Sequence, residues 1–148
     1  MSGAIAHPRQ APVAIWVAQI VGTLVVAAVV LAFVRSMGAP FATDRYDLHR
    51  YALWAILAST FPAVYYLSVF KPRLVADVAA VDARGAPDPR ARSALMRSLA
   101  IGGALCELPM ALGALDLFLG GETRLFVGAT VVTIAIRLSY RPFMRTTG

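Results

Sequence analysis

Two long runs of the sequence carry no charged side chain, and they restrict what this chain can fold into more than any other feature. Residues 13–34 form a stretch of 22 without an Asp, Glu, Lys, Arg or His, and residues 51–70 form another of 20. The hydrocarbon core of a bilayer is about 30 Å thick, so a helix needs about 20 apolar residues to cross it. Both runs are long enough, and the sequence therefore predicts a polytopic integral membrane protein.

Two further apolar segments complete the predicted topology. Residues 98–119 contain Glu107 and Asp116, and residues 125–140 form a shorter segment that contains Arg137. We therefore expect an all-α fold, a four-helix transmembrane bundle that makes residues 1–148 a single membrane domain.

The segment between the second and third spans, residues 71–97, is predicted to be a charged cytoplasmic loop. Its first half permits two interpretations: an amphipathic extension of the second span that ends at Gly85, or a solvated connector. The helical spacing on which the first interpretation depends is that of Leu74, Val75, Val78 and Val81.

The distribution of Lys and Arg predicts the orientation. With both termini in the cytoplasm, that side of the membrane carries ten of these residues and the other side four. Cytoplasmic loops are enriched in Lys and Arg, so we expect both termini to be cytoplasmic and the protein to reside in a cytoplasmic membrane such as the bacterial inner membrane. The ten are Arg9, the six cations of residues 71–97, Arg137, Arg141 and Arg145.

Composition argues against several classes of function. The net charge of +6 would suggest nucleic acid in a soluble protein, but here Lys and Arg serve as membrane anchors, and no nucleic-acid partner is expected. Cys106 is the single cysteine, which excludes an intramolecular disulfide and a cysteine-based zinc site. Neither histidine falls in a span, and the chain has no Gly-rich phosphate loop. We expect no enzyme, no cofactor and no metal.

Glu107 lies near the middle of the third span, where a charged side chain costs about 2.5 to 3.5 kcal/mol on insertion scales. Protonation, a paired cation or a site lined by a partner would offset that cost. Arg137 is the candidate cation, because Glu107 lies 14 residues before the turn at Gly121 and Arg137 lies 16 after it. At about 1.5 Å per residue their depths differ by about 3 Å, so an ion pair is expected unless Arg137 extends to the head groups.

The neighbours of Glu107 suggest an ion-binding site. Pro109 has no N–H and is expected to leave the carbonyl near Leu105 free, so that this carbonyl and the Glu107 carboxylate form a small oxygen-rich spot. Asp116 lies nine residues further on, which turns it to about the opposite face of the helix. We expect Asp116 to be an interfacial residue near the outer surface.

Small residues predict close helix packing. Ala14, Ala18 and Gly22 recur at every fourth position of the first span, and Gln19 beside them can hydrogen-bond across helices or bind a ligand. Such faces exceed what one small bundle needs internally, so we expect a homo-oligomer or a subunit of a larger membrane complex, surrounded by lipid. The third span contributes Gly102, Gly103 and Gly113.

Residues 97–119, "RSLAIGGALCELPMALGALDLFL", resemble the carboxylate-bearing helix of the rotary ATPase proteolipid, subunit c. The resemblance covers 23 of the 148 residues, and the rest of the chain does not match that family. It implies that Glu107 binds H⁺ or Na⁺. The matching features are Arg97, Ile101, Gly102, Ala104, Leu105, Glu107 and Pro109.

Three functional hypotheses follow. The first is a proteolipid-like oligomer in which Glu107 binds or relays a proton or cation. The second is a structural or accessory subunit in which Glu107 and Arg137 form a stabilising buried ion pair. The third is lipid binding at the basic cytoplasmic face.

Overall fold

The computed structural model describes residues 10–43 and 46–142, and it confirms the predicted all-α fold. The described residues contain helices and no strand. The helices are α1 (Gln10–Met37), α2 (Tyr46–Arg84), α3 (Pro89–Cys106), α4 (Leu108–Phe118) and α5 (Thr123–Ser139).

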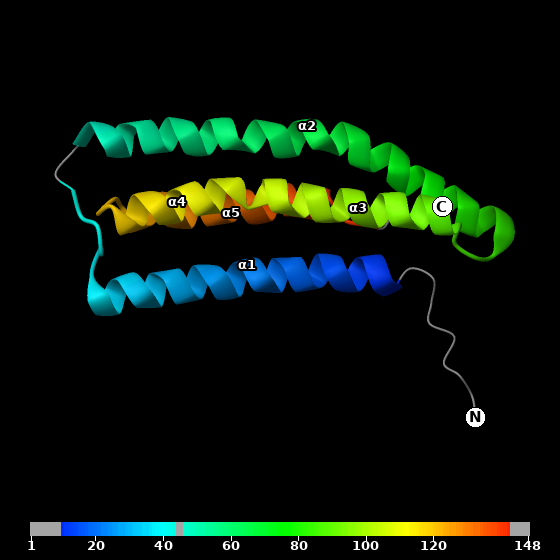
Figure 1. Cartoon of the computed structure of the whole chain (residues 1–148), viewed down its shortest axis with the longest axis horizontal. Coiled ribbons are helices and arrows are strands. Elements are labelled where there is room, and N and C mark those ends of the chain that lie inside the picture. The colour runs from blue at the N-terminus through cyan, green and yellow to red at the C-terminus, as the bar shows by residue number, and fades with distance from the viewer. Residues whose placement is uncertain (1–9, 44–45, 143–148) are drawn as a thin grey trace, which may run out of the picture.

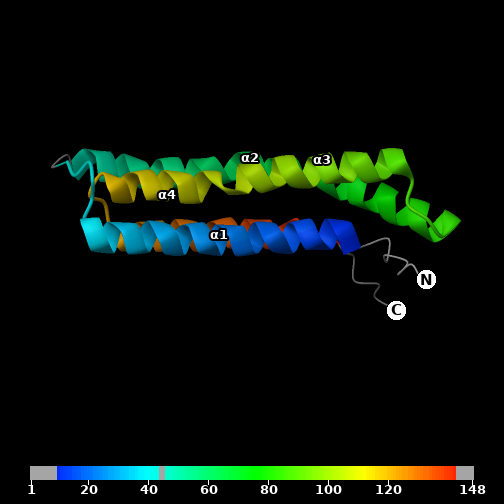
Figure 2. The ribbon, with the colours of Figure 1, turned by 60° about the horizontal axis from the view of Figure 1, so that its bottom comes forward.

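The five helices build a bundle of four rods. Helices α3 and α4 are separated only by Glu107 and run on as one rod, which lies between α1 and α2 in Figure 1. Figure 2 shows α1 and α5 on one side of the bundle and α2 with the α3–α4 rod on the other. Helix α2 packs on α3, α4 and α5, whereas the described part of α1 contacts α3, α4 and α5 but not α2.

Three of the four rods are long and apolar enough to cross a membrane, which supports a polytopic membrane protein. The fourth, α5, has 17 residues. The three candidate spans are Ala11–Met37, Asp47–Arg84 and Pro89–Phe118.

Successive rods run antiparallel, so the bundle has two distinct ends. The start of α1, the α2–α3 turn and the end of α5 lie at one end, and the α2–α3 hairpin extends past the start of α1 there (Figure 1). At the other end, which we call the α4–α5 end, the N–H of Phe41 donates to the Phe118 carbonyl at 3.0 Å, and the N–H of Thr43 donates to the Leu119 carbonyl at 3.1 Å. The cytoplasmic placement of the termini stays a prediction, and Arg9 and Arg145, on which it partly rests, lie outside the described residues.

The segment predicted to be a loop, residues 71–97, is mostly helical, which corrects the solvated-connector interpretation and confirms that the second span extends to Gly85. The predicted apolar face is only partly correct, because Leu74 is buried but Val75 is 48% exposed and Asp77 is buried instead. Helix α2 continues to Arg84 and stops at Gly85, whose φ of +68° suits a residue without a Cβ. The extension stays helical because Leu74 packs with Leu95 and Leu99 of α3 in one buried cluster.

Helix α3 begins immediately after the turn, because Asp88 caps it. The Asp88 carboxylate accepts hydrogen bonds from the N–H of Arg90 at 2.8 Å and of Ala91 at 3.4 Å, and Pro89 fits the first helical position. These N–H bonds, first that of Arg90, hold the pKa of Asp88 below its usual value.

The apolar core is divided in two. One cluster, near the α2–α3 end, contains Phe70, Leu95 and Tyr140, and the other, toward the α4–α5 end, contains Met110 and Phe126. Between these clusters lies a layer of polar side chains, which is where Glu107 is found.

Candidate functional site: a mid-membrane ion pair

Glu107 occupies the interruption between α3 and α4. Pro109 has no N–H to bond the carbonyl of Leu105, so the regular helical pattern breaks here. The N–H of Glu107 instead donates to the Ala104 carbonyl at 3.2 Å, and the N–H of Ala111 donates to the Glu107 carbonyl at 2.9 Å. The carboxylate is thus carried by a short turn inside an otherwise continuous rod.

The structure brings Arg137 of α5 to Glu107. Nη2 of Arg137 lies 2.7 Å from Oε1 of Glu107. The Arg137 side chain is only 3% exposed and the Glu107 side chain 35%. The guanidinium therefore stays at the depth of the carboxylate and does not extend to the head groups. The partners of the carboxylate come from α5 and α1, and no side-chain contact of Glu107 with Leu105 or Pro109 is seen.

The same guanidinium bonds to two other helices. Its Nη1 donates to the backbone carbonyl of Gln19 at 2.5 Å and to Oγ1 of Thr23 at 2.6 Å, both on α1. Its Nη2 also donates to the Gly103 carbonyl of α3 at 2.7 Å. In return, Nε1 of Trp16 on α1 donates to the backbone carbonyl of Arg137 at 3.0 Å. One side chain thus connects α1, α3 and α5, because an arginine offers five donors in a fixed planar arrangement.

Thr23 is the member of the site that the sequence analysis missed. It is 2% exposed, and its Oγ1 lies 2.8 Å from Oε1 of Glu107 and 2.9 Å from the Gln19 carbonyl. The hydroxyl accepts from Arg137 and has one hydrogen to donate to one of these oxygens. A signal was present: Thr23 follows Gln19 by four residues, which places both on one face of α1.

Several polar atoms around the pair have no partner among the described residues. They are Oε2 of Glu107, Oε1 of Gln19, Nε of Arg137 and Oγ1 of Thr133, which lies one turn before Arg137. The exposed part of Glu107 is therefore not Oε2, which is buried. The site holds a neutralised charge pair and keeps hydrogen-bonding capacity for a proton or a small polar molecule.

The predicted packing glycines of the third span all lie at close helix contacts. A Cβ at Gly102 would collide with the ring of Tyr140, one at Gly103 would come within 2.9 Å of Cδ of Gln19, and one at Gly113 would come within 2.9 Å of Cβ of Ala129. Real Cβ atoms avoid contacts this short, so the bundle depends on glycine here.

The small residues of α1 that were predicted to form a packing stripe do not face the bundle. Ala14, Ala18 and Gly22 are all exposed, and nothing lies within 4 Å of a Cβ built at Gly22. Helix α1 turns a different face to the bundle, the one that carries Thr23 and Ala27, because these side chains meet Arg137 and the apolar cluster of α4 and α5. The stripe therefore takes no part in packing among residues 10–43 and 46–142.

Asp116 lies near the end of α4, and its predicted interfacial position stays a prediction. It is 3% exposed, and its Oδ1 lies 2.7 Å from Nδ1 of His49 at the start of α2. The rotation estimate placed Asp116 away from Glu107, and in the structure it contacts a different helix.

Comparison of the chain with protein-family models, with curated proteins and with solved structures gave no match in any of the three. The resemblance to the proteolipid helix therefore rests on residues 97–119 alone. The geometry of the site carries the functional argument.

Proposed function

We propose that this chain is a structural or accessory subunit of a membrane complex, in which the Glu107–Arg137 pair fixes the arrangement of the bundle. The observation that supports this most is the guanidinium of Arg137, which bonds to Glu107, to Gln19 and Thr23 of α1, and to Gly103 of α3. Such a set of bonds positions helices relative to one another. It also occupies one of the two carboxylate oxygens of Glu107, Oε1, with which a transported ion would otherwise interact.

Energetics favour a structural role. Removing one partner of a buried ion pair leaves an uncompensated charge and typically costs 3 to 5 kcal/mol, on the order of half the stability of a small domain. Replacing both partners by groups of similar volume is often close to neutral. A pair that serves structure alone is therefore recognised by rescue in the double variant.

The test compares Glu107→Gln, Arg137→Met and the double variant, purified in one detergent. We expect each single variant to lower the midpoint of thermal unfolding, followed by size-exclusion chromatography. The double variant should be more stable than Arg137→Met, because it removes the unpaired charge of Glu107, although the bonds of Arg137 to Gln19, Thr23 and Gly103 stay lost. Arg35→Gln is the matched control, since Arg35 lies in the last turn of α1, remote from the pair, and should leave the midpoint unchanged. Single variants as stable as the unaltered protein would contradict the proposal.

A second candidate function is proton or cation exchange at Glu107, as in a proteolipid-like oligomer. Two observations favour it: Oε2 of Glu107 has no partner among the residues that the structure describes, and about a third of the side chain is exposed. A hydrophobic carbodiimide, which reacts with protonated carboxyls in lipid, separates the two functions. Labelling mapped to Glu107 by mass spectrometry, and suppressed by Na⁺ or by high pH, supports exchange. Absence of labelling supports the structural role.

Self-association is part of both candidate functions, the structural role and ion exchange. The exposed stripe of Ala14, Ala18 and Gly22 offers a surface on which helices can approach closely in lipid, and it supports a homo-oligomer or a place in a larger complex of a cytoplasmic membrane. Chemical cross-linking in native membranes tests this. Gly22→Leu should reduce the cross-linked species without changing the fold, because no other described element lies within 4 Å of a Cβ at this position.

A further inference from the structure

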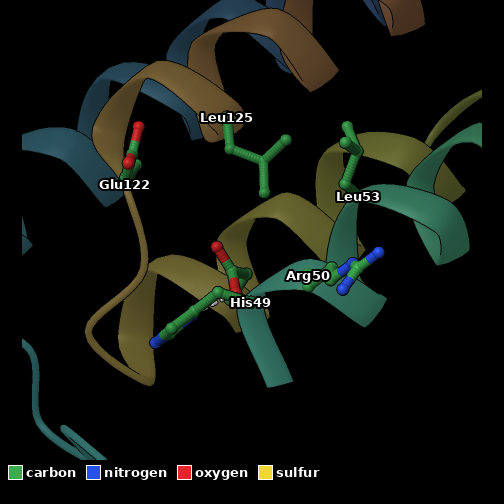
Figure 3. A pocket seen from close by; sticks show the side chains of 6 residues that line it. His49, Arg50, Leu53, Glu122 and Leu125 are labelled. Carbon is green, nitrogen blue, oxygen red and sulfur yellow. Dashed lines mark hydrogen bonds and ion pairs between the residues drawn. The ribbon is translucent and has the colours of Figure 1, made fainter. Parts of the chain in front are cut away.

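A second polar site lies at the α4–α5 end of the bundle, apart from the Glu107–Arg137 pair. Here the start of α2, the end of α4 and the start of α5 enclose a pocket of about 270 Å³ (Figure 3). This volume lies near the lower end of the range of small-molecule pockets, about 300 to 1,000 Å³. The pocket is lined by His49, Arg50, Leu53, Asp116, Glu122 and Leu125.

The walls of this pocket change from charged to apolar along the direction of the membrane normal. Arg50 and Glu122 lie just outside the apolar segments 51–70 and 125–140, which places them at head-group depth. Leu53 and Leu125 lie just inside these segments, at the depth of the acyl chains. A ligand that matches the pocket is therefore polar at one end and apolar at the other.

The charges at the mouth are not used within the described part of the chain. Arg50 and Glu122 are both exposed, and no side-chain hydrogen bond or ion pair links either of them to another described residue. Arg50 comes from α2, whereas Glu122 immediately precedes α5. A cation and a carboxylate thus face one pocket and remain available to a ligand.

Asp116 adds a second carboxylate, and this one is buried. It is 3% exposed; its Oδ1 is bound by His49 at 2.7 Å, but its Oδ2 is buried with no partner among the described side chains and backbone. A buried acceptor without a donor costs free energy. Because Oδ2 is packed over Gly121, a ligand that brings N–H groups would recover this cost after a small rotation of the Asp116 carboxylate toward the pocket.

These features specify the ligand chemistry. Arg50 suits a phosphate, because a guanidinium binds phosphate oxygens in pairs. Glu122 and Asp116 suit a primary ammonium, which carries three N–H donors, and the two leucines suit the glycerol and upper acyl region. A choline head group has no N–H to donate, and an anionic head group would meet two carboxylates. We propose that this pocket binds the head group of a phospholipid with a primary amine, such as phosphatidylethanolamine.

The test uses the full chain in nanodiscs made from equal amounts of phosphatidylethanolamine, phosphatidylcholine and phosphatidylglycerol, with native mass spectrometry of the lipids that stay bound. We expect phosphatidylethanolamine to be enriched about tenfold over each of the other two, since one charge-assisted hydrogen bond changes affinity by about that factor. Glu122→Gln and Arg50→Gln should each remove most of this enrichment. Arg35→Gln, which changes a cation at the same end of the bundle but outside the pocket, should keep it.

A charge-reversal variant distinguishes a changed lipid preference from a loss of binding caused by misfolding. Glu122→Lys makes the mouth cationic, and the preference should move to phosphatidylglycerol. Soluble phosphoethanolamine, added as a competitor, distinguishes a free zwitterion from a lipid, because without the apolar part it should compete weakly. Equal retention of the three lipids, enrichment unchanged by both glutamine variants, or displacement by equimolar phosphoethanolamine would overturn the proposal.

Discussion

Two buried carboxylate–arginine pairs stabilise this chain in different surroundings. Glu107 and Arg137 lie 2.7 Å apart between the two apolar clusters, whereas Asp77 and Arg92 lie 2.8 Å apart in the α2–α3 hairpin. The second pair lies about 10 Å beyond Phe70, where the apolar run of α2 ends, and therefore at or past the head groups. The distances are alike, and the environments are not.

The two pairs differ in which groups can bind the carboxylate once its arginine has been removed. Near the head groups water is close by, but the Asp77 side chain is only 6% exposed, so the hairpin has to open slightly before water can solvate a carboxylate that has lost its arginine. In the hydrocarbon region no water is at hand, so every donor and acceptor needs a partner within the protein. Arg137 accordingly bonds to α1, to α3 and to Glu107 between α3 and α4, while Nε of Arg92 bonds to Asp77 of α2. We therefore expect the depth of a pair in the membrane, more than its N···O distance, to decide how much of the fold depends on it.

The largest expected difference between the two pairs comes from matched Arg→Lys substitutions. Lysine keeps the charge but cannot reproduce the planar set of donors, so Arg137→Lys should lower the free energy of unfolding by about 2 to 3 kcal/mol. Arg92→Lys should cost less, about 1 to 2 kcal/mol, because the lysine keeps the positive charge beside Asp77 and the Arg92 side chain is already 17% exposed at the water-facing end of the bundle. Reversible unfolding in mixed micelles measures both. Equal losses would show that depth does not distinguish the pairs.

A smaller effect is expected from packing beside the mid-membrane pair. Gly103→Ala would press a Cβ against the side chain of Gln19, whose backbone carbonyl holds Arg137, and we expect a loss of about 1 to 3 kcal/mol. Gly22→Ala is the matched control, since its position is open. The same unfolding assay applies. If Gly103→Ala lowers the free energy of unfolding no more than the control does, the Gln19 side chain can move aside more easily than the close contact indicates.

The smallest effect is expected at the water-facing turn of the hairpin. Asp88→Ala removes the cap of α3 and should speed hydrogen exchange at the amides of Arg90 and Ala91 with little change elsewhere. Because the pKa of Asp88 is lowered in the folded chain, its contribution is present above the unfolded pKa of about 3.9 and is lost as the pH falls through the folded value. Protection of these two amides should therefore fade in acid. Protection that persists in Asp88→Ala would assign it to another group.

The fold was predictable from hydropathy, because the length of an apolar run is set directly by the thickness of the bilayer. The ends of the helices were harder to predict. Residues 13–34 are the uncharged part of α1, but the helix itself spans Gln10–Met37. For the first half of segment 71–97, the sequence left open whether it continues the second span as a helix or forms a solvated connector, because its charges and its helical apolar spacing point in opposite directions. In the structure α3 provides partners for both kinds of residue, since Leu74 packs on α3 and Asp77 pairs with Arg92.

The sequence predicted the position of the site residues along the helix axes but not their rotation about those axes. Because each helical residue rises by a fixed distance, Glu107 and Arg137 could be placed at similar depths on either side of their turn. Rotation about a helix axis depends on tertiary packing, and so the sequence could not tell that α1 directs Thr23 inward and Gly22 outward. For the same reason the contact between His49 and Asp116 joins residues that sequence analysis treated separately.

Helix α5 is only 17 residues long, or about 25 Å, roughly 5 Å less than the usual thickness of the hydrocarbon layer. Val127, Val131 and Leu138 on its outer surface are exposed, and in a membrane we expect them to face acyl chains. Lipid beside so short a helix would have to compress to cover it, at a cost of a fraction of a kcal/mol per Å. We therefore expect the bundle to thin the bilayer locally, and a thinner membrane to hold the protein with less distortion than a thick one.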